Sequence, residues 1–370
     1  MLTIKKKLDT TLRYPFSSNN LEELIFFDIE TTGFSADISS VYLIGIVYYK
    51  GDTFHSIQWF ADDYDSEKEL LIRFFTFIKG FRWIIHFNGT TFDMPYLLKK
   101  CKQHHLNFDF SQLSSIDIYK LLLPYKRYFP PSSMKLKALE DFLNIHREDI
   151  YDGGELIHIY GNFLKAKFSH SDEENQLLQI LLLHNYEDIV NLLESSSLLF
   201  YVDWFTKKPL LKKIEECNDT LTFHLRSPLF DDYPLLHKKK QTPSILAQKD
   251  NIIFKGNQAC ATLQVPIYSG ELKFFYENYK DYFYLPKEDT AIHKSVAVYV
   301  EKEYRQKAKK SNCYTRQYGQ FLWQPNSHLS PALKESYSSK SYFYPFDETF
   351  LSNTQLIEQY VQLIMGTFSK

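Results

Sequence analysis

The first half of the chain alternates short apolar runs with polar turns, a pattern that predicts strands first and then strands and helices in turn. The expected strands are Leu24–Ile29, Val41–Tyr49, Phe54–Phe60 and Trp83–Phe87, with a hairpin turn at Lys50–Asp52. This order favours an α/β or α+β domain whose mixed β-sheet is flanked by helices.

Apolar residues three and four positions apart predict the helices of this half. They are Ser66–Gly80, Phe92–His104, the second part of Ser115–Leu123, a helix from Ser132 or Ser133 to Leu143, Gly153–Lys165 and Asp172–Leu199. Residues 1–20 are polar, and we interpret them as a lead-in that packs on the domain.

The pattern of apolar and polar residues changes near Phe205, although no glycine-rich linker follows. Alternating residues beyond it predict a small antiparallel β unit. Its expected strands are Thr220–Leu225, Ile252–Phe254, Ala261–Tyr268 and Glu271–Tyr276, with a turn at Ser269-Gly270. We expect helices at Thr290–Lys309 and Thr354–Met365, a first domain at residues 1–205 and a smaller α+β domain at residues 206–370.

The net charge of −2 conceals an asymmetry. Residues 1–205 hold 20 Lys and Arg against 28 Asp and Glu, whereas residues 206–370 hold 23 against 17. An acidic half joined to a basic half favours an acidic site beside a surface that holds an anionic polymer. Ordinary surface variation also gives such a split.

Four scattered cysteines include no C-x-x-C pair, so neither a zinc site nor a disulfide framework is indicated. Residues 1–7 lack the apolar core of a signal peptide, and no run approaches the ~18 apolar residues of a membrane span. We expect a cytoplasmic protein without membrane contact.

The run Ile25–Gly33 carries the first candidate chemistry. Four apolar residues lead into Asp28 and Glu30, and side chains two apart on a strand point to the same face. Two carboxylates at a buried strand end repel each other unless a cation lies between them, and hard oxygen ligands suit Mg²⁺ or Mn²⁺. Taken alone the pair indicates a solvated strand end, and two later acidic motifs change that balance.

The second motif, His86–Pro95, places a turn at Asn88-Gly89 and Asp93 at the start of a helix. A first-turn aspartate is also a common cap or helix-dipole partner, so both interpretations stay open. Asn88 is equally a substrate contact or a turn residue. Asp117, a fifth acid, either supports the site from outside or caps the helix after it.

The third motif lies in the long helix near residue 188. His184 and Asp188 are four residues apart and therefore share a helix face. A lone pair of this kind favours a surface salt bridge or a core histidine satisfied by its acid.

Together, in this order and spacing, the three motifs resemble the DEDD 3′–5′ exonucleases of the ribonuclease H-like fold, and most closely their YprB-type domain. The matching stretches are Phe27–Gly33, Asn88–Pro95, Ser115–Tyr119, Lys135–Glu140 and His184–Asp188. The resemblance covers roughly residues 22–200 and implies a ribonuclease H-like fold there.

The resemblance also implies that two divalent cations, Mg²⁺ or Mn²⁺, are held by four acids. Asp28 would bridge both ions. Glu30 and Asp188 would bind the ion that activates the attacking water, and Asp93 would support the other. Two cations ~3.5–4 Å apart stabilise the attacking and leaving oxygens of an in-line displacement at phosphorus.

His184 is the expected general base. The two branches of the DEDD group use a tyrosine four residues before the last acid or a histidine five before it; here a histidine stands four before and Leu183 five before. An imidazole pKa of about 6.5 suits proton abstraction near neutrality. Tyr186 lies about 200° around the helix from Asp188 and is the poorer candidate.

In the second half, basic side chains are interleaved with aromatic ones. The cations that we single out are Lys302, Arg305, Lys309 and Lys310. Basic side chains neutralise phosphates while aromatic faces stack on bases, and the alternative is a solvated helix face beside core aromatics. We interpret Lys238–Lys240 as a loop.

These observations predict a metal-dependent 3′–5′ exonuclease that hydrolyses phosphodiester bonds at single-stranded or frayed 3′ ends of DNA or RNA, with Asn88 and Thr31 among its substrate contacts. Two alternatives stay open: a nucleic-acid-binding protein with an inactive nuclease-like domain, and a structure-selective endonuclease on the same site. Four mutually repelling carboxylates favour an active site over an inactive one.

Overall fold

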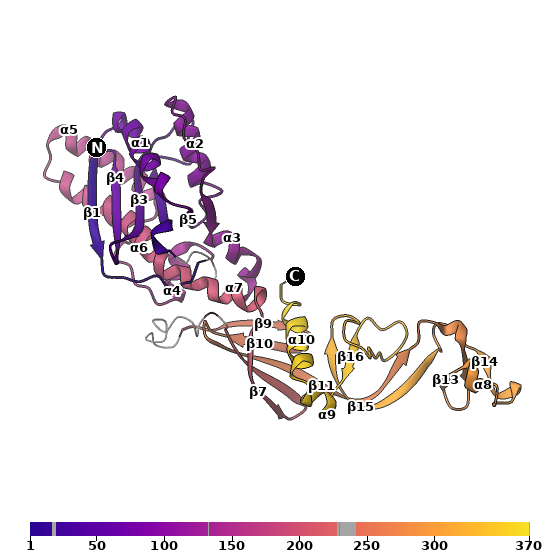
Figure 1. Ribbon diagram of the computed structural model, residues 1–370. Coiled ribbons are helices and arrows are strands. Elements are labelled where there is room, and N and C mark those ends of the chain that lie inside the picture. Colours follow the sequence, from indigo (N-terminus) through magenta and orange to yellow (C-terminus); the bar gives the residue numbers. More distant parts are fainter. Residues whose placement is uncertain (17–19, 132, 228, 230–241, 370) are drawn as a thin grey trace. The chain divides into compact units, whose positions relative to one another are not determined.

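The computed structural model describes residues 1–16, 20–131, 133–227, 229 and 242–369 (Figure 1). They divide into two compact units, with the division between Val202 and Asp203. Unit 1 holds the residues before the division together with Thr242 and Pro243, and unit 2 holds the rest. Ser132 and Lys238–Lys240, for which the sequence predicts a helix cap and a loop, lie outside the described residues.

Unit 1 is built on a six-stranded mixed sheet with the strand order β1-β4-β3-β2-β5-β6. The strands are β1 Leu2–Leu8, β2 Leu24–Thr31, β3 Val41–Lys50, β4 Thr53–Phe60, β5 Trp83–His86 and β6 Ser114–Asp117. Strands β1 to β4 pair antiparallel, whereas β5 runs parallel to both β2 and β6. The expected mixed sheet is confirmed.

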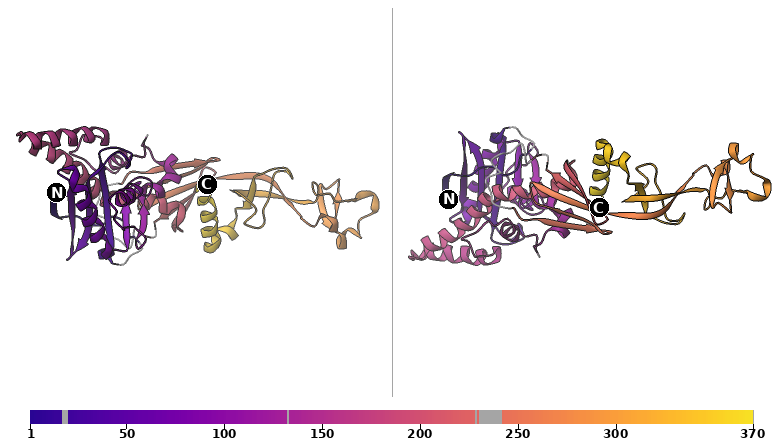
Figure 2. Two further views of the ribbon diagram at one scale, coloured as in Figure 1. Left: turned by 90° about the horizontal axis from the view of Figure 1, so that it is seen from above. Right: turned by 90° about the horizontal axis from the view of Figure 1, so that it is seen from below.

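Helices cover both faces of this sheet, and Figure 2 lets them be followed in two further views. The helices before the division are α1 Glu67–Phe77, α2 Asp93–Gln103, α3 Ile118–Leu122, α4 Leu136–Phe142, α5 Gly153–Ser169 and α6 Glu174–Ser195. A seventh helix, α7 Leu199–Thr206, contains the division itself. On one face Phe27 and Trp59 contact Phe74 of α1. On the other, Gln58 donates a hydrogen bond of 2.9 Å to the Leu182 carbonyl of α6.

Gly45 lets α6 lie close to the sheet. It sits on β3 directly opposite Asp28, and a Cβ there would be 2.1 Å from the Asn185 Oδ1 atom. Asn185 is fully buried and donates from Nδ2 to Asp28 Oδ2 at 3.1 Å. The close approach therefore fixes the helix that carries the third motif against the strand that carries the first.

Unit 2 contains a seven-stranded antiparallel sheet and a separate three-stranded sheet. Its strands are β7 Leu210–Cys217, β8 Thr220–Arg226, β9 Ile245–Lys249, β10 Ile252–Gly256, β11 Cys260–Phe275, β12 Tyr282–Leu285, β13 Thr290–His293, β14 Gln306–Lys307, β15 Tyr314–Gln324 and β16 Tyr342–Pro345. Its helices are α8 Lys294–Ala297, α9 Glu348–Ser352 and α10 Thr354–Met365. The last of these has the predicted bounds.

The segment 1–20, interpreted as a polar lead-in that packs on the domain, contains a strand that the sequence did not predict. Residues 2–8 form β1, which pairs with Phe54–Phe60 of β4. The Lys5–Lys7 run hides the strand from an apolar pattern. Lysines are common on exposed edge strands, where they discourage further pairing.

The predicted turn at Ser269-Gly270 is also wrong, because β11 runs through it without interruption. Ser269 pairs with Gln320 and Gly270 with Gly319 of β15. The Tyr268 ring lies over Gly270, where a Cβ would be 3.1 Å from the Tyr268 hydroxyl. The aromatic cover supplies the side-chain packing that the glycine lacks.

The predicted helix at Thr290–Lys309 is replaced by β13, the four-residue α8 and β14. Residues 290–293 pair with β12 through a turn in which Asp289 adopts a φ of 50°. Val296 and Tyr299, two of the apolar residues in this segment, are 55% and 89% accessible.

Two further properties bear on the class of protein. Within the part of the chain that the structure describes, no helix combines the length and apolar character needed to cross a membrane. All four cysteines are free thiols, with Cys101 and Cys313 buried.

Replacing Gly45 by Ala tests the close packing of α6. We expect a loss of about 1–3 kcal/mol in the free energy of unfolding, because the new methyl group forces Asn185 away from the sheet. Chemical denaturation measures it.

Gly161→Ala is the matched control. Gly161 lies inside α5, where an added Cβ meets no atom within 4 Å, so we expect a gain of about 0.5–1 kcal/mol from helix propensity. Equal and small effects of both substitutions would contradict the role given to Gly45.

Candidate active site

The first motif forms the end of β2, and its two acids point to the α6 face as the strand alternation predicts. The pairing with β3 shifts register between Glu30 and Thr31, so the strand ends immediately after the acids. Thr31 Oγ1 donates to the Gly33 carbonyl at 3.0 Å, and Ser40 donates from its backbone nitrogen to Thr32 Oγ1 at 2.8 Å. The two threonines therefore close the turn that holds this end in place.

The second motif is a tight turn followed by α2. Asn88 has a φ of 64°, and Gly89 lies so close to His86 that a Cβ would be 2.8 Å from the imidazole. The Asn88 backbone nitrogen donates to Asp117 Oδ1 at 2.9 Å. The turn delivers Asp93 as the first residue of α2, with its side chain buried.

Asp117 caps α3, accepting a hydrogen bond from the Lys120 backbone nitrogen at 3.2 Å, so the capping interpretation is confirmed. The same carboxylate accepts from the Thr90 hydroxyl and thereby anchors the second motif. These hydrogen bonds and the charge of His86 outweigh burial and lower the pKa of Asp117.

The third motif brings its histidine and acid to the first. His184 Nε2 lies 3.5 Å from Glu30 Oε1 and 3.3 Å from Asp188 Oδ2. One ligand atom from each of Glu30, His184 and Asp188 lies within 4.8 Å of the others. The two side chains that share a face of α6, His184 and Asp188, therefore lie against Glu30 at the end of β2.

Asp28 and Asp93 face a pocket of about 710 Å³ beside this cluster. Its remaining lining residues are mostly apolar or aromatic, with Asn88 and a short run before α4 among them. They are Ile29, Phe34, Phe87, Asn88, Thr91, Phe92, Tyr119, Ser133, Met134, Lys135 and Leu136. The pocket gives a ligand access to two of the four acids.

Burial and mutual repulsion shift the pKa values of the acids. Burial, followed by the charges of Asp188 and Asp93, raises the pKa values of Asp28 and Glu30 well above their ordinary values. Burial also raises the pKa of Asp93 to about 7, although backbone N–H groups including that of Ile29 oppose it. A cation bound among these carboxylates would be strongly stabilised.

Asp188 shows the opposite shift. Burial alone would raise its pKa, but a hydrogen bond with His184 and the charge of Arg147 outweigh burial and lower it. For His184, burial acts to lower the pKa, whereas Asp188 and Asp149 act more strongly and raise it. The two carboxylates therefore favour the protonated form of the imidazole.

Arg147, to which the sequence interpretation gave no role, is central to the site. It is nearly buried and donates from Nη1 to Asp188 Oδ1 at 2.6 Å and to Glu140 Oε2 at 3.0 Å. Its Nη2 atom donates to the His184 carbonyl at 3.3 Å. Glu140 is completely buried, and burial raises its pKa to about 7 despite the guanidinium.

Asp149 orients the histidine. His184 Nδ1 lies 2.7 Å from Asp149 Oδ2, and Lys137 Nζ lies 2.7 Å from the same oxygen. A carboxylate on one ring nitrogen fixes the orientation of imidazole and leaves the other nitrogen for chemistry. Here the other nitrogen, Nε2, points to Glu30 and Asp188.

Tyr186 points elsewhere, as its position on the helix predicts. The Lys6 ammonium lies 4.1 Å from the centre of its ring, which places it against β1. His184 is therefore the group of this motif that the fold brings to the acids.

The other predicted substrate contacts are distributed differently. Asn88 lines the pocket beside Asp28 and Asp93. Thr31 adjoins the acids, but its hydroxyl is engaged in the turn. The remaining four belong to unit 2, where Arg305 is half-buried and the three lysines are exposed: Lys302, Lys309 and Lys310.

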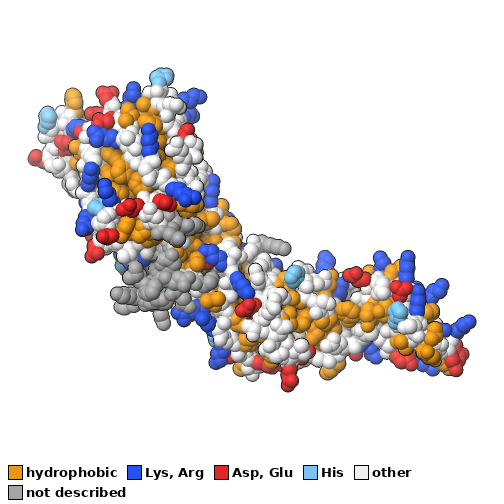
Figure 3. All heavy atoms as spheres, viewed as in Figure 1, with side chains coloured by type: hydrophobic (Ala, Val, Ile, Leu, Met, Phe, Trp, Pro, Cys, Tyr) orange, Lys and Arg blue, Asp and Glu red, His pale blue; other side chains and the backbone are white. Residues whose placement is uncertain are grey.

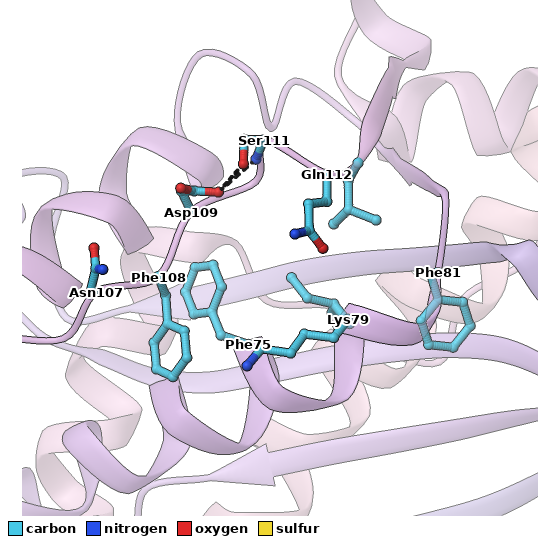
Figure 4. Close-up of a pocket in the computed structure, with 10 residues that line it drawn as sticks. Phe75, Lys79, Phe81, Asn107, Phe108, Asp109, Ser111 and Gln112 are labelled. Carbon is cyan, nitrogen blue, oxygen red and sulfur yellow. Dashed lines mark hydrogen bonds between the residues drawn. The ribbon is translucent and has the colours of Figure 1, made fainter.

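A smaller pocket of unit 1, of about 210 Å³, contains none of the predicted site residues (Figure 4). Phe75 and Phe108 stack there at 5.2 Å, and Asp109 accepts a hydrogen bond from Ser111. Asp109 is the one acid among the residues that line this pocket, so the pocket has no cluster of acids that could hold a metal ion.

Residues 25–199 match the family model of the RNase H superfamily. This part of the chain is therefore a ribonuclease H-like domain, as the motifs predict, and the match supports a nuclease. A comparison with curated proteins found no match.

Among solved structures, the chain is similar to the family B DNA polymerase from the hyperthermophilic archaeon Pyrobaculum calidifontis. The likeness has 13% identity and a TM-score of 0.37, and it covers 70% of this chain and 35% of that chain. The chain thus matches about a third of the polymerase's length, and a TM-score this low does not establish a shared fold.

Arg147→Met tests the ion-pair network. We expect a loss of about 3–5 kcal/mol in the free energy of unfolding, because Glu140 would remain buried without its cation. Glu140→Gln in the Arg147→Met background should recover part of this loss, since no unpaired charge then remains at position 140. A double-mutant cycle by chemical denaturation measures both, and a cost below about 1 kcal/mol for Arg147→Met would refute the assignment.

The raised pKa of Asp93 predicts a pH dependence of stability in the presence of a chelator. Its pKa is about 7 in the folded protein against 3.8 ordinarily, so the folded protein holds a proton that the unfolded chain has released. The stabilisation is complete below pH 3.8 and is lost as the pH rises through 7.

We therefore expect the melting temperature to fall between pH 5.5 and pH 8, and to fall less in Asp93→Asn. Saturating Mg²⁺ or Mn²⁺ should flatten the wild-type profile, because the cation replaces the proton. Identical slopes for wild type and Asp93→Asn would show that Asp93 does not titrate in this way.

Proposed function

We propose that unit 1 is a metal-dependent 3′–5′ exonuclease that cleaves phosphodiester bonds of DNA or RNA by a two-metal-ion mechanism. The observation that carries the proposal is the convergence of Asp28, Glu30, Asp93 and Asp188 from three separate elements beside His184. The ribonuclease H-like match over residues 25–199 supports it.

The donor set fits Mg²⁺ or Mn²⁺. Carboxylate oxygens are hard ligands that these ions prefer, and the raised pKa values of Asp28 and Glu30 identify charge that the protein leaves uncompensated. Asp28, Glu30, Asp93 and Asp188 would hold the ions. When bound, they supply charge neutralisation at phosphorus and an activated water.

His184 has the geometry of a proton acceptor. Asp149 fixes its Nδ1 side, and Nε2 faces Glu30 and Asp188. Cations bound at Asp188 would offset the largest influence that raises the pKa of His184, while Asp149 stays on Nδ1. They would thereby favour a neutral imidazole that accepts a proton at Nε2. Asn88 and the aromatic lining of the adjacent pocket would receive the terminal nucleotide, a single-stranded or frayed 3′ end.

The test uses a 5′-labelled single strand, as DNA and as RNA, with Mg²⁺ or Mn²⁺. We expect a ladder that shortens from the 3′ end, and a decrease of more than about 100-fold in rate for Asp28→Asn and Glu30→Gln, beyond the range typical of residues that only orient ligands. Asp52→Asn, an exposed acid in a turn of the same unit, is the matched control and should retain full activity.

Other outcomes assign the alternatives. Cleavage of a circular strand would indicate an endonuclease on the same site. Binding without cleavage under any divalent metal would indicate a nucleic-acid-binding protein with an inactive nuclease-like domain. The cytoplasmic location stays a prediction.

A further inference from the structure

The end of unit 2 that contains β12, β13, α8 and β14 projects from a long two-stranded ribbon. Strands β11 and β15 pair without interruption from Ile267 opposite Leu322 to Phe275 opposite Tyr314. The residues between those last two partners, 276–313, form the three-stranded sheet and its short helix, which we call the tip (Figure 1). Lys, Arg and hydrophobic side chains gather on its surface, with acids among them (Figure 3).

The tip contains a pocket of about 350 Å³. Its lining combines three lysines with aromatic rings and one alanine: Tyr279, Lys280, Tyr282, Phe283, Lys294, Lys307 and Ala308. Phe283 stands opposite Lys307 in the β12–β14 pair, so strand pairing itself places a cation beside an aromatic ring. The pocket is thus a product of the fold, not a chance grouping of long side chains.

The charge within this pocket is only partly compensated. Lys294 forms an ion pair of 3.0 Å with Asp281. For Lys280 and Lys307 the described residues provide no ion pair, and both side chains are exposed. Two positive charges therefore face the pocket without a counter-ion.

The aromatic rings are held in fixed orientations. Tyr282 stacks on Tyr276 with ring centres 4.4 Å apart and an angle of 19° between the planes. The Arg305 guanidinium lies 5.0 Å from the centre of the Phe283 ring and donates to the Ala297 carbonyl. Arg305, a cation that the sequence assigned to substrate, therefore supports the tip from within.

We propose that the tip pocket binds a phosphate group of single-stranded nucleic acid, with Lys280 and Lys307 at the phosphate and the aromatic rings beside the adjoining base. Unpaired lysines next to half-exposed aromatic rings provide the two interactions that single strands use, ion pairing with the backbone and base stacking. The choice of nucleic acid rests on the function proposed for unit 1. The pocket itself is separate from the acidic cluster and lies wholly within unit 2.

The experiment measures fluorescence anisotropy of a labelled 20-nucleotide single strand with the full chain in EDTA, so that metal-dependent cleavage does not interfere. We expect Lys280→Ala with Lys307→Ala to weaken binding at least tenfold at low salt. The slope of log affinity against log salt concentration should fall by about 0.7, the value for one phosphate contact to a single strand.

Lys287→Ala with Lys340→Ala is the matched control, since both residues are exposed lysines of unit 2 that do not line the pocket. We expect it to change binding by less than threefold. Equal losses of affinity in the two double variants would contradict the proposed binding site and indicate general electrostatic attraction. Unchanged affinity in Lys280→Ala with Lys307→Ala would contradict the proposal directly.

Competition identifies the source of the phosphate. Inorganic phosphate at millimolar concentration should leave the strand bound, because it lacks the base that lies beside the aromatic rings. Displacement of the strand by inorganic phosphate would overturn the proposal in favour of a small-anion site. Cleavage by a protein whose tip variants bind normally refutes this inference alone, whereas tip-dependent binding without cleavage refutes the proposed exonuclease alone.

Discussion

The repulsion among buried carboxylates is the constraint around which unit 1 is built. Asp28, Glu30 and Asp93 are each shifted toward the neutral form by burial and by the charge of Asp188. A fold that gathers such groups loses stability unless other interactions hold the elements together. Here the close approach of α6 at Gly45 and the hydrogen bond from Asn185 to Asp28 do so. Arg147 and His184 supply the positive charge that the protein itself contributes.

Much of this site follows from local sequence patterns. Strand alternation predicts that Asp28 and Glu30 share a face, and helical spacing predicts the same for His184 and Asp188. Both predictions hold, because a buried strand and a buried helix leave little freedom in side-chain direction. That the two faces meet is a tertiary fact, which the sequence supports only through the resemblance of its motifs to a known family.

The network of Glu140, Arg147 and Asp149 could not be obtained in this way. Arg147 lies in the irregular segment between α4 and α5, and it contacts Asp188, 41 residues further along the chain. No periodicity relates such positions. The only signal was a cluster of charged residues, His146–Asp149, which is equally typical of a solvated loop. The error at Gly270 has a related cause, since its local turn preference is overridden by pairing with Gly319, which is distant in sequence. Residues 290–293, in contrast, pair with the neighbouring strand β12 instead of starting a helix.

The direct pairing of Phe275 with Tyr314 has a topological consequence. Residues 276–313 are an insertion at the end of a β-hairpin whose two strands are already paired. A tight turn in place of this insertion would leave all the other pairs of β11 and β15 in register. The insertion can therefore lengthen, shorten or change its chemistry without altering the sheet that carries it. Substitutions in it are therefore constrained by the tip's own packing and contacts, and not by the register of the ribbon.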